Sequence, residues 1–192
     1  MGKIKVLAFA GSTREGSFNK KLARAALAST AAAGADTTFL DLRDLALPMY
    51  DEDLEAQGGL PASAKSLKET LRAHDAFIIA SPEYNSSVSA VLKNAIDWAS
   101  RPEPGQPSLS CFTNKVCALF AASPGALGGL RGLTHIRQIL GNINVLLLPQ
   151  QFALIKAHEA FDADGRLKDP KQQEMVDGIA KALVTITSKL KA

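Results

Sequence analysis

Residues 4–19 read IKVLAFAGSTREGSFN, and this stretch decides the fold class. Its first part, Ile4–Ala10, is a continuous apolar run, which is typical of a strand covered on both faces of a sheet. A loop of small and polar residues follows. A helix is predicted from about Phe18 to Ala33, because its apolar residues recur along one side. A buried strand joined by a short loop to an amphipathic helix is the repeating unit of proteins with a parallel sheet.

The same alternation continues to the end of the chain. Further strands are predicted at Thr37–Leu42, Ala76–Ala80, Val116–Ala122 and Val145–Leu148, and further helices at Leu60–His74, Val88–Ala99, Leu130–Leu140 and Val176–Leu190. Five buried strands alternating with five helices predict an α/β three-layer sandwich with a parallel sheet between two layers of helices. Right-handed crossovers favour the flavodoxin-like strand order 2-1-3-4-5. We expect residues 1–192 to form a single domain.

Composition excludes several classes of protein. The net charge is +3, and the 22 Lys and Arg residues are spread along the chain rather than gathered in the basic stripe that nucleic-acid binding requires. Cys111 and Cys117 have no histidine partner at zinc spacing, so we expect no metal site and two buried thiols of a cytoplasmic protein. The run Ile4–Ala10 is too short to span a membrane, so no membrane association is expected.

Open parallel sheets bind ligands at the carboxyl ends of their strands, where the strand order switches. The loop after the first strand, Gly11–Asn19, is suited to an anion, because its backbone amides can turn inward and the next helix adds its positive dipole end. Its side chains add the hydroxyls of Ser12, Thr13 and Ser17, the amide of Asn19 and the guanidinium of Arg14. The alternative is a plain turn, in which Ser17 caps the helix and Arg14 lies in solvent.

This loop resembles a nucleotide triphosphate site only in part. Gly11 and Gly16 have the spacing of the Walker A pattern GxxxxGK[ST]. However, Ser17 stands in place of the lysine and Phe18 in place of the hydroxyl that binds magnesium. The β- and γ-phosphates would therefore lack their charge partner, which excludes an ATPase or GTPase.

The loop after the third predicted strand, Ser81–Ser87, reads SPEYNSS. Pro82 fixes the exit angle of the chain, so that three backbone amides can face the polar edge of a flat heterocycle. These amides belong to Glu83, Tyr84 and Asn85. In the alternative, Ser86 or Ser87 caps the next helix and Tyr84 merely packs.

The loop after the fourth predicted strand reads SPGALGG, from Ser123 to Gly129. It contains no GxGxxG pattern, so a dinucleotide grip is not indicated. Its glycines allow the backbone to approach a ligand closely. The alternative is a plain Ser-Pro-Gly turn. All three loops follow alternate buried strands at the same end of the predicted sheet, and this coincidence favours a binding site over three unrelated turns.

These residues resemble those of the NAD(P)H-dependent FMN reductases, including the quinone and chromate reductase branch. The resemblance covers nearly the whole chain. It rests on Gly11–Asn19, on SPEYN from Ser81 with LKNAIDW from Leu92–Trp98, and on SPG-x-x-GG from Ser123 with Arg131 after it.

The resemblance implies one FMN per subunit. The first loop would hold the phosphate and ribityl chain, the second would border the isoalloxazine ring, and Ser123 would lie beside the ring from the third. The residues expected to bind the cofactor are Ser12, Thr13, Arg14, Ser17, Phe18, Asn19, Pro82, Glu83, Tyr84, Asn85, Ser123 and Gly125.

The resemblance also implies an activity: hydride passes from NADPH or NADH to FMN and on to a small acceptor, namely a quinone, flavin, chromate, azo or nitro compound. The flavin carries out the chemistry, so no catalytic side chain is expected. His74, His135 and His158 are accordingly expected to be structural. Members of the family are dimers or tetramers, so a homodimer or homotetramer is expected.

Two alternatives remain open at this point. A flavodoxin-type electron carrier would share the fold and the FMN, but such carriers are usually strongly acidic and this chain has a net charge of +3. A non-catalytic module that binds a phosphorylated ligand is the other alternative. A flavin spectrum excludes the module, and NADPH consumption with a quinone but no partner protein excludes the carrier.

Overall fold

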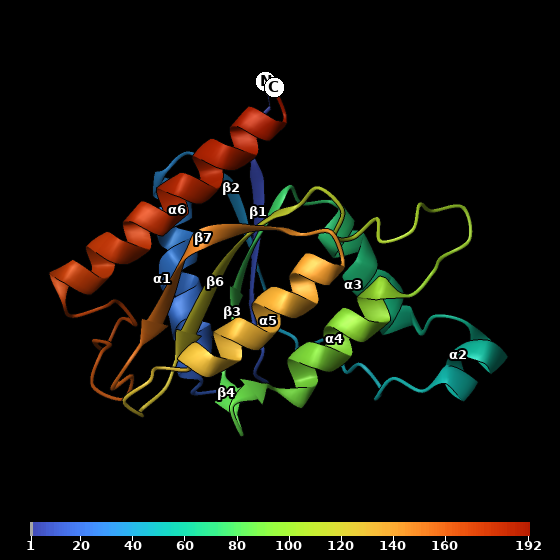
Figure 1. The fold of residues 1–192 in the computed structure, drawn as a ribbon, viewed down its shortest axis with the longest axis horizontal. Coiled ribbons are helices and arrows are strands. Elements are labelled where there is room, and N and C mark those ends of the chain that lie inside the picture. The colour runs from blue at the N-terminus through green and yellow to red at the C-terminus, as the bar shows by residue number, and fades with distance from the viewer. Residues whose placement is uncertain (1) are drawn as a thin grey trace.

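The main sheet of the computed structural model, which describes residues 2–192, has five parallel strands in the order β2-β1-β3-β6-β7 (Figure 1). The strands are β1 (Lys5–Ala10), β2 (Asp36–Leu40), β3 (Ala76–Ala80), β6 (Val116–Ala122) and β7 (Leu146–Leu154). Counted within this sheet, the order is 2-1-3-4-5, which confirms the prediction from right-handed crossovers.

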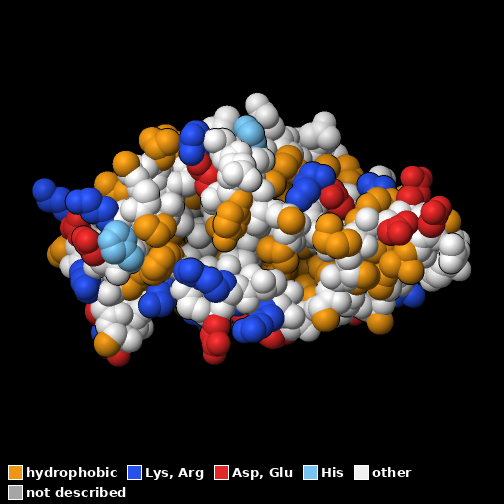
Figure 2. Space-filling model, turned by 90° about the horizontal axis from the view of Figure 1, so that it is seen from below, with side chains coloured by type: hydrophobic (Ala, Val, Ile, Leu, Met, Phe, Trp, Pro, Cys, Tyr) orange, Lys and Arg blue, Asp and Glu red, His pale blue; other side chains and the backbone are white. Residues whose placement is uncertain are grey.

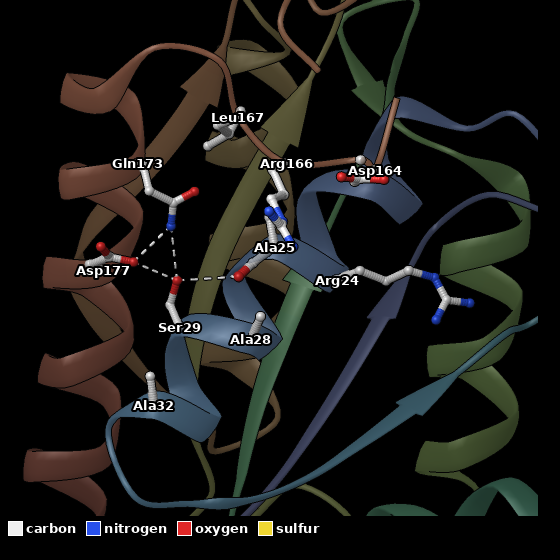
Figure 3. Close-up of a pocket in the computed structure, with 11 residues that line it drawn as sticks. Arg24, Ala25, Ala28, Ser29, Ala32, Asp164, Arg166, Leu167, Gln173 and Asp177 are labelled. Carbon is white, nitrogen blue, oxygen red and sulfur yellow. Dashed lines mark hydrogen bonds between the residues drawn. The ribbon is translucent and has the colours of Figure 1, made fainter. Parts of the chain in front are cut away.

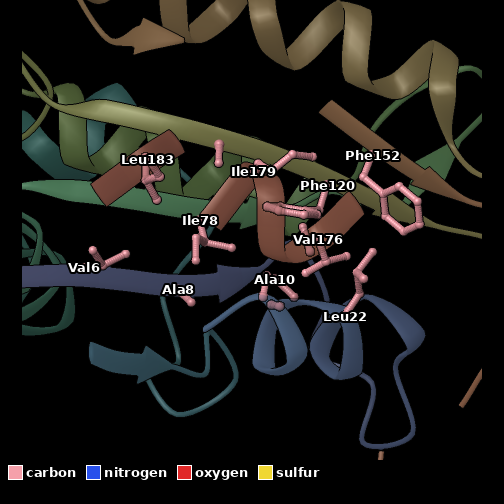
Figure 4. Packing of buried hydrophobic residues seen from close by; sticks show 14 of the residues in the cluster. Val6, Ala8, Ala10, Leu22, Ile78, Phe120, Phe152, Val176, Ile179 and Leu183 are labelled. Atoms are coloured by element: carbon pink, nitrogen blue, oxygen red, sulfur yellow. The ribbon is translucent and has the colours of Figure 1, made fainter. Parts of the chain in front are cut away.

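Helices cover both faces of this sheet. One face carries α1 (Phe18–Ala32) and α6 (Pro170–Leu190), and the other carries α3 (Ala62–Arg72), α4 (Ala90–Ser100) and α5 (Leu130–Asn142). Every residue of β3 and β6 is buried, as their continuous apolar sequences predicted. Figure 4 shows the packing on the α1 and α6 side, where Leu22 and Val176 meet Ile78 and Phe120 of the sheet.

The last strand is longer than predicted. β7 continues past Leu148 to Leu154 and contains Pro149, which cannot donate a ladder hydrogen bond. The strand tolerates the proline because β7 is an edge strand and its register with β6 shifts between Cys117 and Leu119. Arg137 of α5 braces this irregular part by donating to the Leu148 carbonyl at 3.0 Å.

Two further features were not predicted from the sequence. The first is α2 (Glu52–Gly58), which buries none of its residues and so lacks an apolar stripe; it lies at the periphery in Figure 1. The second is an antiparallel pair, β4 (Glu83–Tyr84) and β5 (Ser87–Val88), inside the expected second loop. The two turn residues, Asn85 and Ser86, have φ values of 50° and 65°, which suit a tight hairpin turn.

Candidate functional site

The loops that follow β1, β3 and β6 come together at the carboxyl end of the sheet and enclose a cavity of about 150 Å³. Figure 2 looks at the molecule from this end, where apolar and basic side chains are interspersed. The cavity is lined by Ser12, Arg14, Ser17, Phe18, Asn19, Pro82, Glu83, Tyr84, Ala122, Ser123 and Pro124. The structure thus brings nine of the twelve predicted residues together; Thr13, Asn85 and Gly125 flank the cavity in sequence without lining it.

The first loop presents unpaired backbone donors. Within residues 2–192, the backbone amides of Thr13 and of residues 15–19 donate to no protein acceptor. Ser17 caps α1, because its Oγ accepts from the Lys20 amide at 3.4 Å, and its hydroxyl proton is left to donate elsewhere. The predicted helix cap therefore coexists with a set of unpaired backbone donors, and these donors and the helix dipole place positive potential at the cavity.

The Arg14 side chain is exposed to solvent, as the plain-turn alternative predicted, but it also lies along this loop. Its Nη2 donates to the Gly16 carbonyl at 3.0 Å, and its guanidinium lies 5.2 Å from the centre of the Phe18 ring. Its backbone amide is held by Ser12 Oγ at 3.3 Å. These contacts use only part of the guanidinium, so several N–H groups remain to bind an anion in the cavity.

A second cation near the loop is already neutralised. Lys20 on the first turn of α1 is buried, and its Nζ lies 2.6 Å from Asp41 Oδ2. Burial raises the pKa of the Asp41 carboxyl, but the hydrogen bonds from Lys20 and the Arg43 amide outweigh it and hold that pKa below its usual value. Arg14 is therefore the cation that this loop offers to a ligand.

Glu83, at the start of the hairpin, serves α5 with its side chain. One carboxylate oxygen lies 2.6 Å from Arg131 Nη2, and the other accepts the Gly132 amide at 3.0 Å. Gly129, at the start of α5, supplies no side-chain cap, so Glu83 caps this helix from another loop. Desolvation raises the pKa of the Glu83 carboxyl, but the Gly132 and Arg131 hydrogen bonds outweigh it and lower that pKa overall.

The cap of α4 is Ser89, so the alternative in which Ser86 or Ser87 caps this helix is wrong. Ser89 Oγ accepts the Leu92 amide at 3.3 Å and donates to the Gly11 carbonyl at 2.6 Å. It therefore ties α4 to the first loop. Its position directly before the apolar stripe was the available sequence signal. Tyr84 is 63% exposed, so it does not merely pack either.

The glycines of the third loop approach the sheet. A Cβ on Gly128 would lie 2.9 Å from backbone atoms of Ala153, and one on Gly129 would lie 2.8 Å from Ala121 Cβ. Both residues also have positive φ, at 61° and 95°. Their absent side chains let the loop and α5 lie close against β6 and β7. Gly125 is part of a turn in which its amide donates to Ser123 Oγ at 3.2 Å.

Part of the LKNAIDW stretch has a structural role that its sequence did not reveal. Asn94 Oδ1 accepts the Tyr50 amide at 2.7 Å, and Asn94 Nδ2 donates to the Pro48 carbonyl at 2.9 Å. Trp98 Nε1 donates to the same carbonyl at 2.8 Å, and the Tyr50 ring packs edge-on against the indole. These residues therefore hold the segment that precedes α2 against α4.

The three histidines lie outside the three-loop cavity. His74 contacts the Thr70 carbonyl, His135 contacts Ser87, and His158 lies near Glu159, each through a ring nitrogen. Among residues 2–192 no group of three or more His, Cys, Asp or Glu side chains is placed to hold a metal ion. Over the same span, every helix is too short or too polar to cross a membrane.

A larger cavity, of about 550 Å³, lies between α1 and α6, away from the three loops (Figure 3). Ser29, Gln173 and Asp177 line it and hydrogen bond to one another, with Ser29 Oγ donating to Asp177 Oδ1 at 2.6 Å. The other lining side chains are mostly small or exposed at the rim. Its three central polar groups satisfy one another, but Arg24 and Arg166 also line it, so it too offers guanidinium donors. What distinguishes the three-loop cavity is the set of unpaired backbone amides at the N-terminus of α1.

Comparison with known proteins connects this geometry to a function. Residues 4–159 match the family model for NADPH-dependent FMN reductases. An NAD(P)H-dependent FMN reductase of Pseudomonas aeruginosa is 42% identical over 182 residues, which cover 94% of this chain and 93% of the relative. An NAD(P)H:quinone oxidoreductase of Solanum tuberosum is 33% identical, covering 98% of this chain and 95% of the relative. The solved structure of FerB, a flavoenzyme NAD(P)H:(acceptor) oxidoreductase from Paracoccus denitrificans, superposes with a TM-score of 0.81 at 32% identity, covering 97% of this chain and 98% of FerB.

Proposed function

This chain belongs to the NADPH-dependent FMN reductase family, and we propose that its three-loop cavity binds FMN and reduces a small acceptor such as a quinone with hydride from NADPH or NADH. The chain is an FMN-dependent oxidoreductase. Its cofactor is held by the residues of the three loops, and a quinone is the acceptor. The Solanum tuberosum relative, an NAD(P)H:quinone oxidoreductase, supports that acceptor.

The single observation that carries the assignment is the first loop. Its unpaired amides, the free hydroxyl proton of Ser17 and the guanidinium of Arg14 are all donors, and they meet at the N-terminus of α1. A phosphate monoester can accept hydrogen bonds from all of these donors. A neutral ligand has too few acceptors and would leave donors of the loop unpaired. The residues present therefore fit the phosphate end of FMN.

The rest of the cavity suits a flat ring. Pro82, Tyr84 and Pro124 line it beside Ser123, and these side chains are largely apolar. The cavity of about 150 Å³ is smaller than pockets that enclose a whole ligand, so part of the bound cofactor stays accessible. When bound, FMN supplies a ring that accepts hydride from NAD(P)H and passes electrons to the acceptor. The chain's own residues hold the phosphate, orient the ring and leave one side open to both substrates.

The test is a titration followed by an assay. Apoprotein should bind FMN with stoichiometry of one per chain and should bind riboflavin much more weakly, because riboflavin lacks the phosphate. The reconstituted protein should then oxidise NADPH or NADH with a benzoquinone and no partner protein, with the parallel double-reciprocal lines of a ping-pong reaction. Equal affinity for FMN and riboflavin would exclude the first loop as the phosphate site, and absence of quinone-dependent oxidation would exclude the reductase function.

We extend the proposal to the organisation of the protein. Residues 1–192 act as a single domain, and two or four copies assemble with the open side of the cavity near a subunit contact. The exposure of large apolar side chains supports a contact between copies, as Met49 is 69% and Leu127 49% exposed. Two free buried cysteines support a reducing, cytoplasmic environment. Sedimentation velocity tests the assembly; a monomer at micromolar concentration would contradict it.

A further inference from the structure

The end of β6 lacks a strand partner on one side. In the ladder between β3 and β6, the Ser81 amide donates to the Phe120 carbonyl at 2.8 Å. Because alternate residues of a strand point their backbone groups to the same side, the amide and carbonyl of Ala122 also face β3. However, β3 ends at Ala80, and Pro82 leads the chain away into the β4–β5 hairpin. Both backbone groups of Ala122 would therefore be unpaired.

The side chain of Asn19 takes the place of the missing strand. Its Nδ2 donates to the Ala122 carbonyl at 2.9 Å, and its Oδ1 accepts the Ala122 amide at 2.9 Å. A primary amide presents one donor and one acceptor side by side, which is the pattern of a backbone neighbour in a ladder. Asn19 is only 4% exposed and Ala122 5%, so solvent cannot easily supply these bonds instead.

These two hydrogen bonds connect parts of the site that are far apart in sequence. Asn19 lies in the first turn of α1, beside the unpaired amides of the first loop, and Ala122 directly precedes Ser123 of the third loop. We propose that Asn19 is a positioning residue that fixes the distance between the phosphate cradle and the loop beside the flavin ring. This inference rests on the proposed function, because it assigns the two ends of the bound FMN to these two loops.

Asn19 has a contact in the structure that was not predicted from the sequence. Its amide was expected to bind the cofactor directly, and in the structure one Nδ2 hydrogen and one Oδ1 lone pair are taken by Ala122. A ligand that contacts both loops gains affinity when their spacing is set before binding, since no ordering is then required. The spacing also decides how the ring is placed, so Asn19 should influence hydride transfer as well as affinity.

The first test uses apoprotein and needs no flavin. Amide hydrogen exchange is followed at Ala122 in the wild type, in Asn19→Ala and in Asn19→Ser, whose short hydroxyl cannot bridge both backbone groups. Exchange at Ala122 should accelerate by about tenfold or more in Asn19→Ala, because its amide loses its acceptor. Thr30→Ala is the matched control: it removes another buried side chain of α1 that hydrogen bonds only within its helix, to Ala26. That control should leave exchange at Ala122 within about twofold of the wild type.

The second test separates positioning from stability. Affinity for FMN should fall by about tenfold in Asn19→Ala. At saturating FMN, turnover with NADPH should still be about tenfold below that of the wild type, and the absorption spectrum of the bound flavin should be shifted. A residue that only stabilises the fold, like Thr30, changes neither quantity once the protein is folded and saturated. If Asn19→Ala does not fold, Asn19→Ser should show the same changes in FMN affinity, turnover and flavin spectrum, at a smaller size.

The outcomes are distinguishable. Wild-type protein that fails to bind FMN overturns the proposed function, while the exchange result at Ala122 still stands or falls by itself. Wild-type protein that binds FMN, with Asn19 variants that match it in turnover and spectrum at saturation, overturns the positioning role. Unchanged exchange at Ala122 in both variants overturns it too.

Discussion

Single charged residues in the site are held by backbone groups, and this determines what their removal should do. Arg14 is tied to the Gly16 carbonyl, and Glu83 receives the Gly132 amide. Arg14 also lies against the Phe18 ring, and Glu83 also forms an ion pair with Arg131. Both side chains therefore contact the protein before any ligand arrives, so substitutions should change specific contacts rather than disorder a loop.

Replacing Arg14 with alanine should weaken FMN binding by about 1.5–3 kcal/mol, or roughly ten- to a hundredfold, because a charge-assisted contact to the phosphate is lost. Fluorescence titration of apoprotein measures this. Riboflavin is the control ligand, and its affinity should not change, since it has no phosphate. An equal loss for both ligands would mean that Arg14 shapes the loop instead of binding the anion.

Replacing Glu83 with glutamine should lower the free energy of unfolding at pH 7 by about 1 kcal/mol, because the ion pair with Arg131 is lost while an amide oxygen can still accept from Gly132. The pKa of Glu83 is lowered in the folded state, so its contribution is complete above its ordinary value of 4.5 and is lost as pH falls through the folded pKa. The difference between wild type and variant should therefore shrink in urea titrations repeated at decreasing pH below 4.5. Arg131→Gln is the matched control for the ion pair, and a difference that persists in acid would contradict this account.

At the scale of elements, the ends of helices and strands are joined across the site. Asn19 joins α1 to β6, Ser89 joins α4 to the end of β1, and Glu83 joins the hairpin to α5. The third loop adds no such side-chain bond to another element and depends on close packing of its glycines instead. It should therefore be the part of the site most sensitive to added volume.

Two glycine-to-alanine substitutions should have effects of opposite sign. In Gly129→Ala the new Cβ would lie 2.8 Å from Ala121 Cβ at a φ of 95°, so we expect a loss of about 2–4 kcal/mol in unfolding free energy. Gly178 lies within α6 and has no atom within 4 Å of an added Cβ, so Gly178→Ala should stabilise the protein by about 0.5–1 kcal/mol. Chemical denaturation of both variants checks the pair. A neutral Gly129→Ala would show that the loop relaxes freely.

At the scale of the whole molecule, the two thiols report on global opening. Cys111 and Cys117 are both fully buried, and burial raises the pKa of each thiol, which suppresses the reactive thiolate. Native protein at pH 8 should therefore leave both thiols unmodified by an aromatic disulfide reagent. Both should react once denaturant unfolds the chain, at a rate that follows the unfolding transition. Rapid modification of one thiol in native protein would reveal local opening near that cysteine.

Local sequence patterns predicted the alternation of strands and helices, the strand order and the three loops of the site. It did so because hydrophobic period and turn chemistry are properties of neighbouring residues, as in Ile4–Ala10 and in the loop that follows it. It did not reveal α2, which has no buried face, or the β4–β5 hairpin, whose turn contains no glycine.

Which polar side chains line the cavity and which brace it depends on contacts between distant residues. Asn19 meets Ala122 across 103 positions of the chain, Gly11 meets Ser89 across 78, and Glu83 meets Gly132 across 49. Hydrogen bonds between such distant residues follow no period and leave no local signal in the sequence. They form because the parallel sheet brings the ends of its strands together, and because a buried amide or carbonyl at those ends must find a partner.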